Sequence, residues 1–315
     1  MNKMRQDSQP LIDIHNFSKY FGDFQAVREL SFEVQKGEMF GFLGRNGAGK
    51  TTTLRTLLNI YQPDEGHLHI QGTPFSQHRV HEVGYLPEER GLYTRASVVD
   101  TVQYFARLRG LDSASARERT QILLERFELQ DVKKKRIQDL SSGMQQKIQI
   151  IISIIHKPRV LVLDEPFRGL DPVNRQLAFD ILSELNEAGT TILFSSHQIS
   201  EIENLCDRII MISKGEKKAY GRIQEIKSLF EPRFIHIHYE GQLPALDVEW
   251  CEDQGNQAEL KFKPGTNPQE ILKTLVDSQV RVEKFEISRP SLNQIFLELC
   301  AEKQTGSAIT KSRLS

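Results

Sequence analysis

The chain has 315 residues, of which 38% are hydrophobic and 26% charged, a composition typical of a soluble globular protein with about two domains and not of disordered or fibrous classes. Its 41 basic and 42 acidic residues give a net charge of −1, so no global field attracts nucleic acid or acidic lipid. The longest apolar run, at 148–155, is far shorter than the about 20 residues of a membrane-spanning helix, and no secretory signal is recognisable. We therefore expect a cytoplasmic protein.

From residue 11 to about 230, short apolar strands alternate with amphipathic helical patterns, which predicts β and α units around a largely parallel sheet. The expected strands begin at Leu11, Met39, Leu68, Arg159, Thr191 and Arg208. The expected helices lie at 98–109, 114–127, 143–156, 173–188 and 199–205. Because the stretch at about 88–157 is mostly helical in pattern, we expect it to form a helical subdomain inserted between sheet strands.

After Glu231 and Pro232 the pattern changes to short alternating strands and two amphipathic helices. This change predicts that residues 11–230 form one domain and residues 231–300 a small accessory α+β domain. The tail at 301–315 is polar and aperiodic, so we expect it to be disordered.

A phosphate-binding loop follows the strand that begins at Met39 and precedes a helical segment, because residues 44–51 read GRNGAGKT. Glycines allow backbone N–H groups to turn inward around phosphate oxygens, and the helix presents its positive end to them. Lys50 can then bridge the outer phosphates while the Thr51 hydroxyl binds Mg²⁺. The predicted ATP-binding residues here are Gly44, Arg45, Asn46, Gly47, Ala48, Gly49, Lys50, Thr51 and Thr52.

A second acidic motif ends the buried strand that begins at Arg159, where Asp164 and Glu165 stand side by side. In a parallel sheet, ligands collect beyond the carboxyl ends of the strands, at the edge where the phosphate loop also lies. We expect Asp164 to bind Mg²⁺ through the water shell of the ion and Glu165 to act as general base on an attacking water. The alternative for such a pair is a solvated strand end.

Residues 140–144 read LSSGM at the start of a predicted helix, and here the chain resembles the nucleotide-binding ATPases of ABC transporters, from residue 11 to about 220. In that family a signature, usually LSGGQ, contacts the γ-phosphate of ATP held by the other subunit. Ser141 and Gly143 match it and are implied to bind ATP, whereas Ser142 and Met144 depart from it. Read alone, the pentamer could be only a capped helix start. The resemblance implies an α/β P-loop NTPase of ABC type with an inserted helical subdomain.

Other residues match the family in order along the chain. Phe21 resembles the aromatic residue that stacks on adenine, with a core aromatic as the alternative, and residues 168–172 resemble the loop that couples the two sites of a dimer. His197 resembles the histidine that contacts the γ-phosphate and holds the attacking water. Glu88 replaces the usual glutamine and could still serve Mg²⁺ or be a solvated turn, while Arg168 replaces a small residue.

The segment VGYLPEERGLY, the altered signature and the C-terminal unit together resemble the bacterial sodium-extrusion type of ABC ATPase. This resemblance implies an ATP- and Mg²⁺-dependent energy-coupling subunit, attached to the inner face of the membrane through a transmembrane permease. It also implies a second ATP-binding subunit, as a homodimer or heterodimer, and an exporter. Two alternatives remain: a soluble ABC-type ATPase acting on nucleic acid or ribosomes, and a non-hydrolysing nucleotide-binding regulatory module. We do not expect nucleic acid as a partner.

Overall fold

The computed structural model describes residues 9–89 and 91–300, so the tail at 301–315 lies outside the described residues. The chain divides into two compact units between Gly221 and Arg222, before the boundary that the sequence suggested at 230. The boundary lies before α7 (Ile223–Ser228) because this helix contacts α9 (Leu292–Cys300) and therefore belongs to the second unit. There the Arg289 guanidinium also donates hydrogen bonds to the carbonyls of Ser228 and Phe230, at 2.6 and 2.7 Å.

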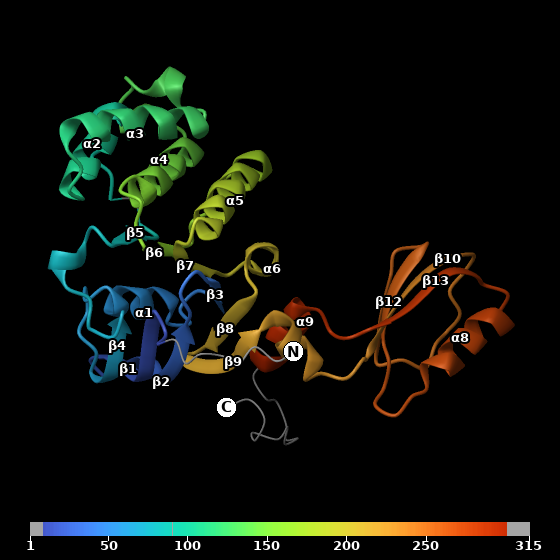
Figure 1. Ribbon diagram of the computed structural model, residues 1–315. Coiled ribbons are helices and arrows are strands. Elements are labelled where there is room, and N and C mark those ends of the chain that lie inside the picture. Colours follow the sequence, from blue (N-terminus) through green and yellow to red (C-terminus); the bar gives the residue numbers. More distant parts are fainter. Residues whose placement is uncertain (1–8, 90, 301–315) are drawn as a thin grey trace, which may run out of the picture. The chain divides into compact units, whose positions relative to one another are not determined.

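Two sheets form the first unit (Figure 1). The six-stranded sheet has the order β5-β6-β7-β3-β8-β9, and its strands from β5 to β8 run parallel. Its strands are β3 (Met39–Gly44), β5 (Val83–Leu86), β6 (Val160–Asp164), β7 (Thr191–Ser196), β8 (Arg208–Ser213) and β9 (Glu216–Arg222). The three-stranded antiparallel sheet has the order β2-β1-β4, with β1 (Ile12–Phe21), β2 (Phe24–Val34) and β4 (Glu65–Ile70).

The antiparallel sheet corrects the prediction of a single, largely parallel arrangement. The strands predicted from Leu11 and Leu68 pair with each other through β1 and β4, and β2 was not predicted. The missed signal is a two-residue turn, in which Gly22 has φ 58° and Phe21 pairs with Phe24 across the hairpin.

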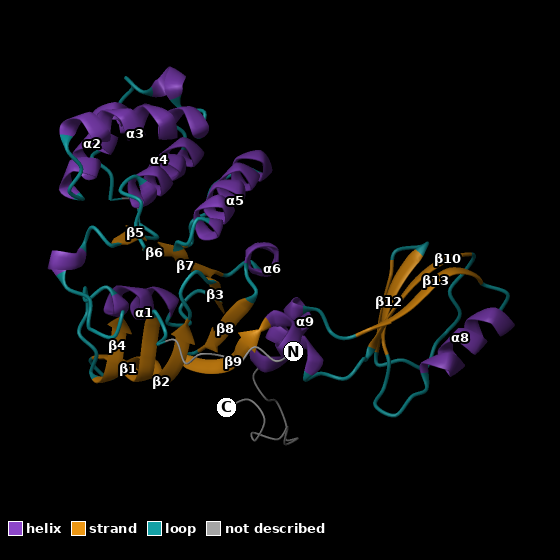
Figure 2. Ribbon diagram, viewed as in Figure 1, coloured by secondary structure: helices purple, strands orange, loops and turns teal. Residues whose placement is uncertain are grey.

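Helices follow the strands at predicted positions, and side chains cap several of them. Ser97, Asp112 and Ser141 accept backbone N–H groups at the starts of the three helices that fall within 88–157. Figure 2 shows these three, α2, α3 and α4, grouped together, and α2 contacts both of the others. The helices of the first unit are α1 (Lys50–Leu57), α2 (Val98–Leu108), α3 (Ser113–Arg126), α4 (Ser142–Ile154), α5 (Pro172–Glu187) and α6 (Ile199–Leu205), with short 3-10 turns at Gln77–Arg79, Gln130–Val132 and Ile137–Asp139.

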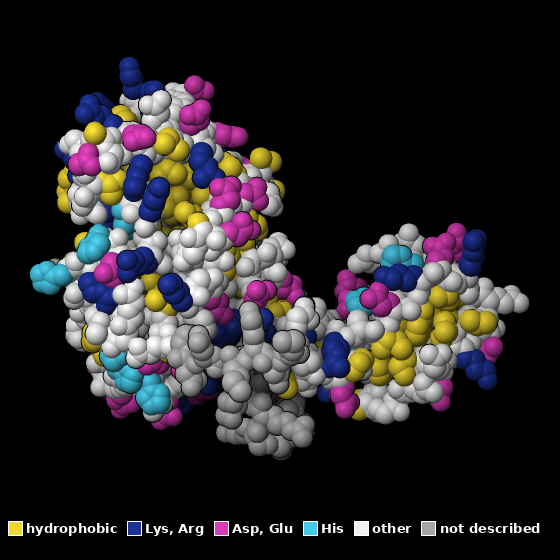
Figure 3. Space-filling view, in the orientation of Figure 1, with side chains coloured by type: hydrophobic (Ala, Val, Ile, Leu, Met, Phe, Trp, Pro, Cys, Tyr) yellow, Lys and Arg dark blue, Asp and Glu magenta, His cyan; other side chains and the backbone are white. Residues whose placement is uncertain are grey.

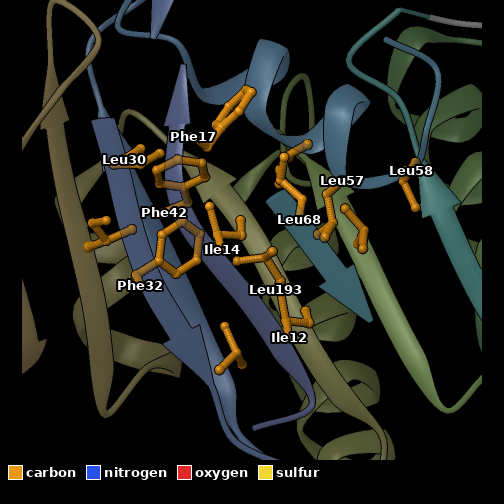
Figure 4. Close-up of a cluster of buried hydrophobic side chains, with 14 of the residues drawn as sticks. Ile12, Ile14, Phe17, Leu30, Phe32, Phe42, Leu57, Leu58, Leu68 and Leu193 are labelled. Carbon is orange, nitrogen blue, oxygen red and sulfur yellow. The ribbon is translucent and has the colours of Figure 1, made fainter. Parts of the chain in front are cut away.

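The core of the first unit joins its two sheets, because α1 contacts β2 and β4 of one sheet and β3 and β6 of the other. Figure 4 shows apolar side chains from these elements and from β1 meeting, among them Phe17, Phe42, Leu57 and Leu68. Burial of this apolar surface fixes α1, and with it the loop that precedes α1, on the edge of the parallel sheet.

The second unit is a four-stranded sheet of order β11-β12-β10-β13 whose apolar side chains pack with α8 in a separate core. Its elements are β10 (Phe234–Glu240), β11 (Trp250–Asp253), β12 (Gln257–Lys261), α8 (Pro268–Asp277) and β13 (Arg281–Ser288), besides α7 and α9. In the described part of the chain, no helix has the length and apolar character needed to cross a membrane.

Candidate nucleotide site

The loop between β3 and α1 has the backbone geometry of an anion cradle. Gly47 has φ 79° and Gly49 has φ 103°, a left-handed conformation that side chains rarely adopt. A Cβ at Gly49 would also lie 2.8 Å from the carbonyl oxygen of Ala26, so this residue must be glycine for two reasons. Glycines in this conformation allow N–H groups of the loop to face an anion at the start of α1, where the helix dipole favours negative charge.

Lys50 opens α1, and its side chain is buried, with 6% of it exposed. Its ammonium donates a hydrogen bond to the carbonyl of Gly44 at 2.7 Å and lies 3.3 Å from Oε1 of Glu165. The ammonium is therefore held between the phosphate loop and the acidic pair that ends β6.

Asp164 is fully buried at the end of β6, where its Oδ1 accepts a hydrogen bond from the Ser195 hydroxyl at 2.5 Å. Its Oδ2 is buried without a hydrogen-bond partner among the described residues. Burial raises the pKa of Asp164, and the charges of Glu88 and Glu165 act in the same direction, against the hydroxyls of Ser195 and Thr51. These contacts show that Thr51, Glu88 and Asp164 lie within electrostatic reach of one another.

Glu165 has φ 51°, a strained conformation for a residue other than glycine, and its N–H donates to Ser195 on β7. This backbone turn places its carboxylate between the Lys50 ammonium and the His197 imidazole. Oε1 faces Lys50, and Oε2 lies 2.8 Å from Nδ1 of His197, which follows β7. The His197 side chain is 43% exposed whereas that of Glu165 is buried, so their contact lies at the boundary between the protein interior and solvent.

A pocket of about 380 Å³ joins the phosphate loop to the β1–β2 hairpin and to two acidic residues. Its lining comprises Phe21, Phe24, Ala26, Arg45, Asn46, Gly47, Ala48, Gly49, Lys50, Thr51, Thr52, Glu88 and Glu165. Phe21 is 45% exposed and meets Tyr61 edge to face, so it is a surface aromatic and not the core aromatic that the sequence left open. Phe24, at the other end of the hairpin turn, was missed by the sequence reasoning.

Two of the departures from the family pattern, Glu88 and Arg168, meet in the structure. The Arg168 guanidinium donates to Oε1 of Glu88 at 2.8 Å, and Glu88 is 36% exposed while Arg168 is 64% exposed. Because both side chains are in contact with solvent, the pair contributes little to the stability of the fold. Its main consequence is that Arg168 fixes the position of the Glu88 carboxylate.

The signature residues Ser141 and Gly143 do not line this pocket. Ser141 caps α4 by accepting the N–H of Met144 at 3.3 Å. A Cβ at Gly143 would lie 3.3 Å from the carbonyl oxygen of Gly169, so the start of α4 adjoins the loop at 168–172. The start of α4 therefore presents a capped helix end, which suits an anion.

Ser195 is the main site residue that sequence reasoning missed, since it binds both members of the acidic pair. The available signal was that β7 is buried along its length yet ends in two serines. A buried hydroxyl needs a partner, and the neighbouring strand supplies it.

Comparison with known proteins yields consistent matches. A family model described as ABC transporter matches residues 27–168, and one described as ATP-binding protein DrrA1-3-like, C-terminal domain, matches residues 221–300. The chain is 39% identical to the ABC transporter ATP-binding protein YhaQ of Bacillus subtilis, across 91% of this chain and 98% of that protein. It is 36% identical to the Nod factor export ATP-binding protein I of Ralstonia nicotianae, across 93% and 94%. A solved ATP binding subunit of an ABC transporter superposes with a TM-score of 0.65 at 28% identity, covering 70% of this chain and 92% of that one.

Proposed function

Because this chain belongs to the ATP-binding proteins of ABC transporters, we propose that it is the energy-coupling subunit of a membrane exporter. It has the expected α/β fold of an ABC-type P-loop ATPase, and it is an ATPase. The observation that carries the proposal is that Lys50, Asp164, Glu165 and His197 converge at one edge of the parallel sheet. The Ralstonia relative is named as a Nod factor export protein, which supports the outward direction of transport.

The two ends of the pocket suit the two parts of ATP, its phosphates and its base. The loop N–H groups and Lys50 supply a cradle for the phosphates, while Phe21 and Phe24 offer exposed aromatic faces at the hairpin. Stacking on an aromatic face is tolerant of the base, so we expect the phosphates to contribute most of the affinity.

The residues also fit Mg²⁺, which would neutralise phosphate charge when bound. One buried oxygen of Asp164 has no hydrogen-bond partner within residues 9–89 and 91–300, and the hydroxyl of Thr51 lies near this carboxylate. Oxygen donors of this kind are the ligands that Mg²⁺ prefers. Thr51 and Asp164 would hold the ion, and Glu88, which lines the same pocket as Thr51, would supply a further oxygen donor near it.

Hydrolysis needs a base near the terminal phosphate, and Glu165 is placed for it. Its carboxylate accepts the proton of the attacking water, while Lys50 and His197 hold its two oxygens in position. His197 is the more exposed of the two partners, so it can contact the γ-phosphate as well as Glu165.

Ser141 and Gly143 serve a second nucleotide in this proposal. Because they open α4 away from their own chain's pocket, we infer that a second ATP-binding subunit, identical or related, receives them against its γ-phosphate. A transmembrane permease completes the transporter and holds the subunit at the cytoplasmic face of the membrane.

Phosphate release from ATP by the purified chain, followed by recovery of a membrane protein bound to it from detergent extracts, tests the proposal. Hydrolysis together with a bound permease is the expected result. ATP binding without any hydrolysis would favour the non-hydrolysing regulatory module instead.

We expect Glu88→Ala to raise the Mg²⁺ concentration for half-maximal hydrolysis several fold, because a charge beside Asp164 is lost. Glu88→Gln, which restores the family's usual residue, should retain activity. Arg168→Ala is the informative control, since it frees Glu88 from its ion pair and should leave the Mg²⁺ requirement the same or lower. An unchanged Mg²⁺ dependence in all three variants would show that Glu88 is only a solvated residue of a turn, without a part in metal binding.

The second unit is assigned to contact with a partner and not to chemistry. Hydrophobic side chains gather on the surface of this unit (Figure 3), and Trp250 and Ile287 on its sheet are both exposed. A surface of this kind suits a protein contact.

A protein truncated after Gly221 should bind ATP as tightly as the full chain, because every lining residue of the pocket precedes it. It keeps Tyr220, whose hydroxyl donates to the carbonyl of Glu33 at 2.9 Å. Truncation at 230 is the matched comparison, and it should be less soluble because α7 then lacks α9. Self-association or permease attachment should weaken in both. Loss of ATP binding in the folded 221 form would show that the site extends into the second unit.

A further inference from the structure

The outer face of the antiparallel sheet carries a group of imidazole and carboxylate side chains, which we call the histidine face: Asp13, His15, His67 and His69. The register pairs Asp13 on β1 with His69 on β4, and His15 with His67. Because side chains alternate along a strand, the intervening residues point to the opposite face. These intervening residues are apolar and buried: Ile12, Ile14, Leu68 and Ile70. Figure 3 shows histidine side chains gathered on this part of the first unit.

Three members of the histidine face converge closely. Asp13, His67 and His69 each offer one ligand atom, and these atoms all lie within 4.8 Å of one another. Nε2 of His67 is 3.3 Å from Oδ2 of Asp13, and the rings of His67 and His69 stack with their centroids 4.5 Å apart. The ring of His15 lies next to this group, 5.4 Å from that of His67.

We propose that Asp13, His67 and His69 bind a divalent transition-metal ion of the Zn²⁺ class. Two imidazoles and one carboxylate form a donor set that suits Zn²⁺, Co²⁺ and Ni²⁺, whereas Mg²⁺ and Ca²⁺ prefer oxygen donors alone. The site therefore differs in chemistry from the one assigned to Mg²⁺ beside the nucleotide. Three protein ligands leave a coordination position open to water.

The scaffold favours this site because its backbone is fixed by strand pairing. Two donors come from alternate residues of β4 and the third from the paired strand β1, so binding orders only side-chain torsions. Tetrahedral coordination at about 2.1 Å needs donor atoms about 3.4 Å apart. Half-buried side chains whose ligand atoms already lie within 4.8 Å reach that spacing by small rotations.

The site is independent of ATP binding. Asp13 stands near the start of β1 and Phe21 ends that strand, and neither Asp13 nor the two histidines are among the lining residues of the nucleotide pocket. Changes at the histidine face should therefore leave nucleotide affinity intact, which supplies a readout of correct folding.

Titration of the full chain, without a polyhistidine tag and stripped with chelator, with Zn²⁺ and with Co²⁺ tests the proposal. Wild type should bind one equivalent of Zn²⁺ tightly, and Co²⁺ should give visible absorption bands without a thiolate charge-transfer band. A double variant, His67→Gln with His69→Gln, and the single variant Asp13→Asn should each lose at least about tenfold in affinity. All should bind ATP normally.

The chain offers a matched control in His236 and His238, which are also separated by one residue on a strand, β10 of the second unit. His236→Gln with His238→Gln should keep the tight site. The proposal is overturned if wild type binds no equivalent of Zn²⁺, or if the β4 double variant binds as wild type does. It is equally overturned if the β10 control loses the site or if Co²⁺ reports a cysteine ligand.

Discussion

Lys50→Ala is expected to abolish tight ATP binding. The ammonium is held at the mouth of the phosphate loop by the carbonyl of Gly44 and by Glu165, so it is already ordered where phosphate oxygens collect. Its removal takes away the buried ammonium of the loop and leaves backbone dipoles and the exposed Arg45 to balance several phosphate charges. Titration of the purified variant with a fluorescent ATP analogue measures the loss.

Removing Lys50 also leaves the carboxylate of Glu165 buried beside His197 alone, and breaking a buried pair in this way typically costs about 3–5 kcal/mol. A double variant, Lys50→Ala with Glu165→Gln, removes both charges and should recover thermal stability without recovering ATP binding. Lys36→Ala, at an exposed lysine of the same unit, is the matched control and should bind as wild type does. ATP affinity close to that of wild type in a folded Lys50→Ala protein would refute the assignment of the loop.

Glu165→Gln is expected to bind ATP and Mg²⁺ but to hydrolyse ATP at least about a hundredfold more slowly, the usual scale for loss of a general base. The amide keeps the shape of the side chain and can still accept from Lys50, so binding should survive. It cannot take the proton of the attacking water. Single-turnover phosphate release separates this chemical step from nucleotide binding.

The same variant tests the composite site, because unhydrolysed ATP should hold two subunits together. Light scattering should show a dimer with ATP and a monomer without it. Glu118→Gln, at an exposed position of α3, is the control and should match wild type in turnover. If the Glu165 variant stayed monomeric with ATP while wild type dimerised, the assignment of Ser141 and Gly143 to a neighbour's nucleotide would fail.

Much of the nucleotide site was predictable because its parts are contiguous in the chain. The phosphate loop needs a strand, eight residues and a helix in direct succession, and each is visible as a local pattern. The buried run before Asp164 likewise indicates a strand end, and the parallel topology then places that end beside the loop.

Pairings across the fold were not predictable in this way. Two of the residues that depart from the family pattern, Glu88 and Arg168, gave no sign in the sequence that they form one ion pair. Ser195 looked like an ordinary strand residue until β7 was placed next to β6. The unit boundary also moved, because α7 could be assigned only once its packing partner α9 was known.

What the sequence by itself determined is therefore the class of the protein, the phosphate loop and the acidic pair, since periodicity, turn residues and contiguous motifs act over short stretches of chain. The tertiary structure decided which side chains from distant stretches face one another: Glu165 with Lys50 and His197, and Asp13 with His67 and His69. Such contacts depend on strand order and register, which are selected by burial of the whole core and leave no local signal in the residues that they bring together.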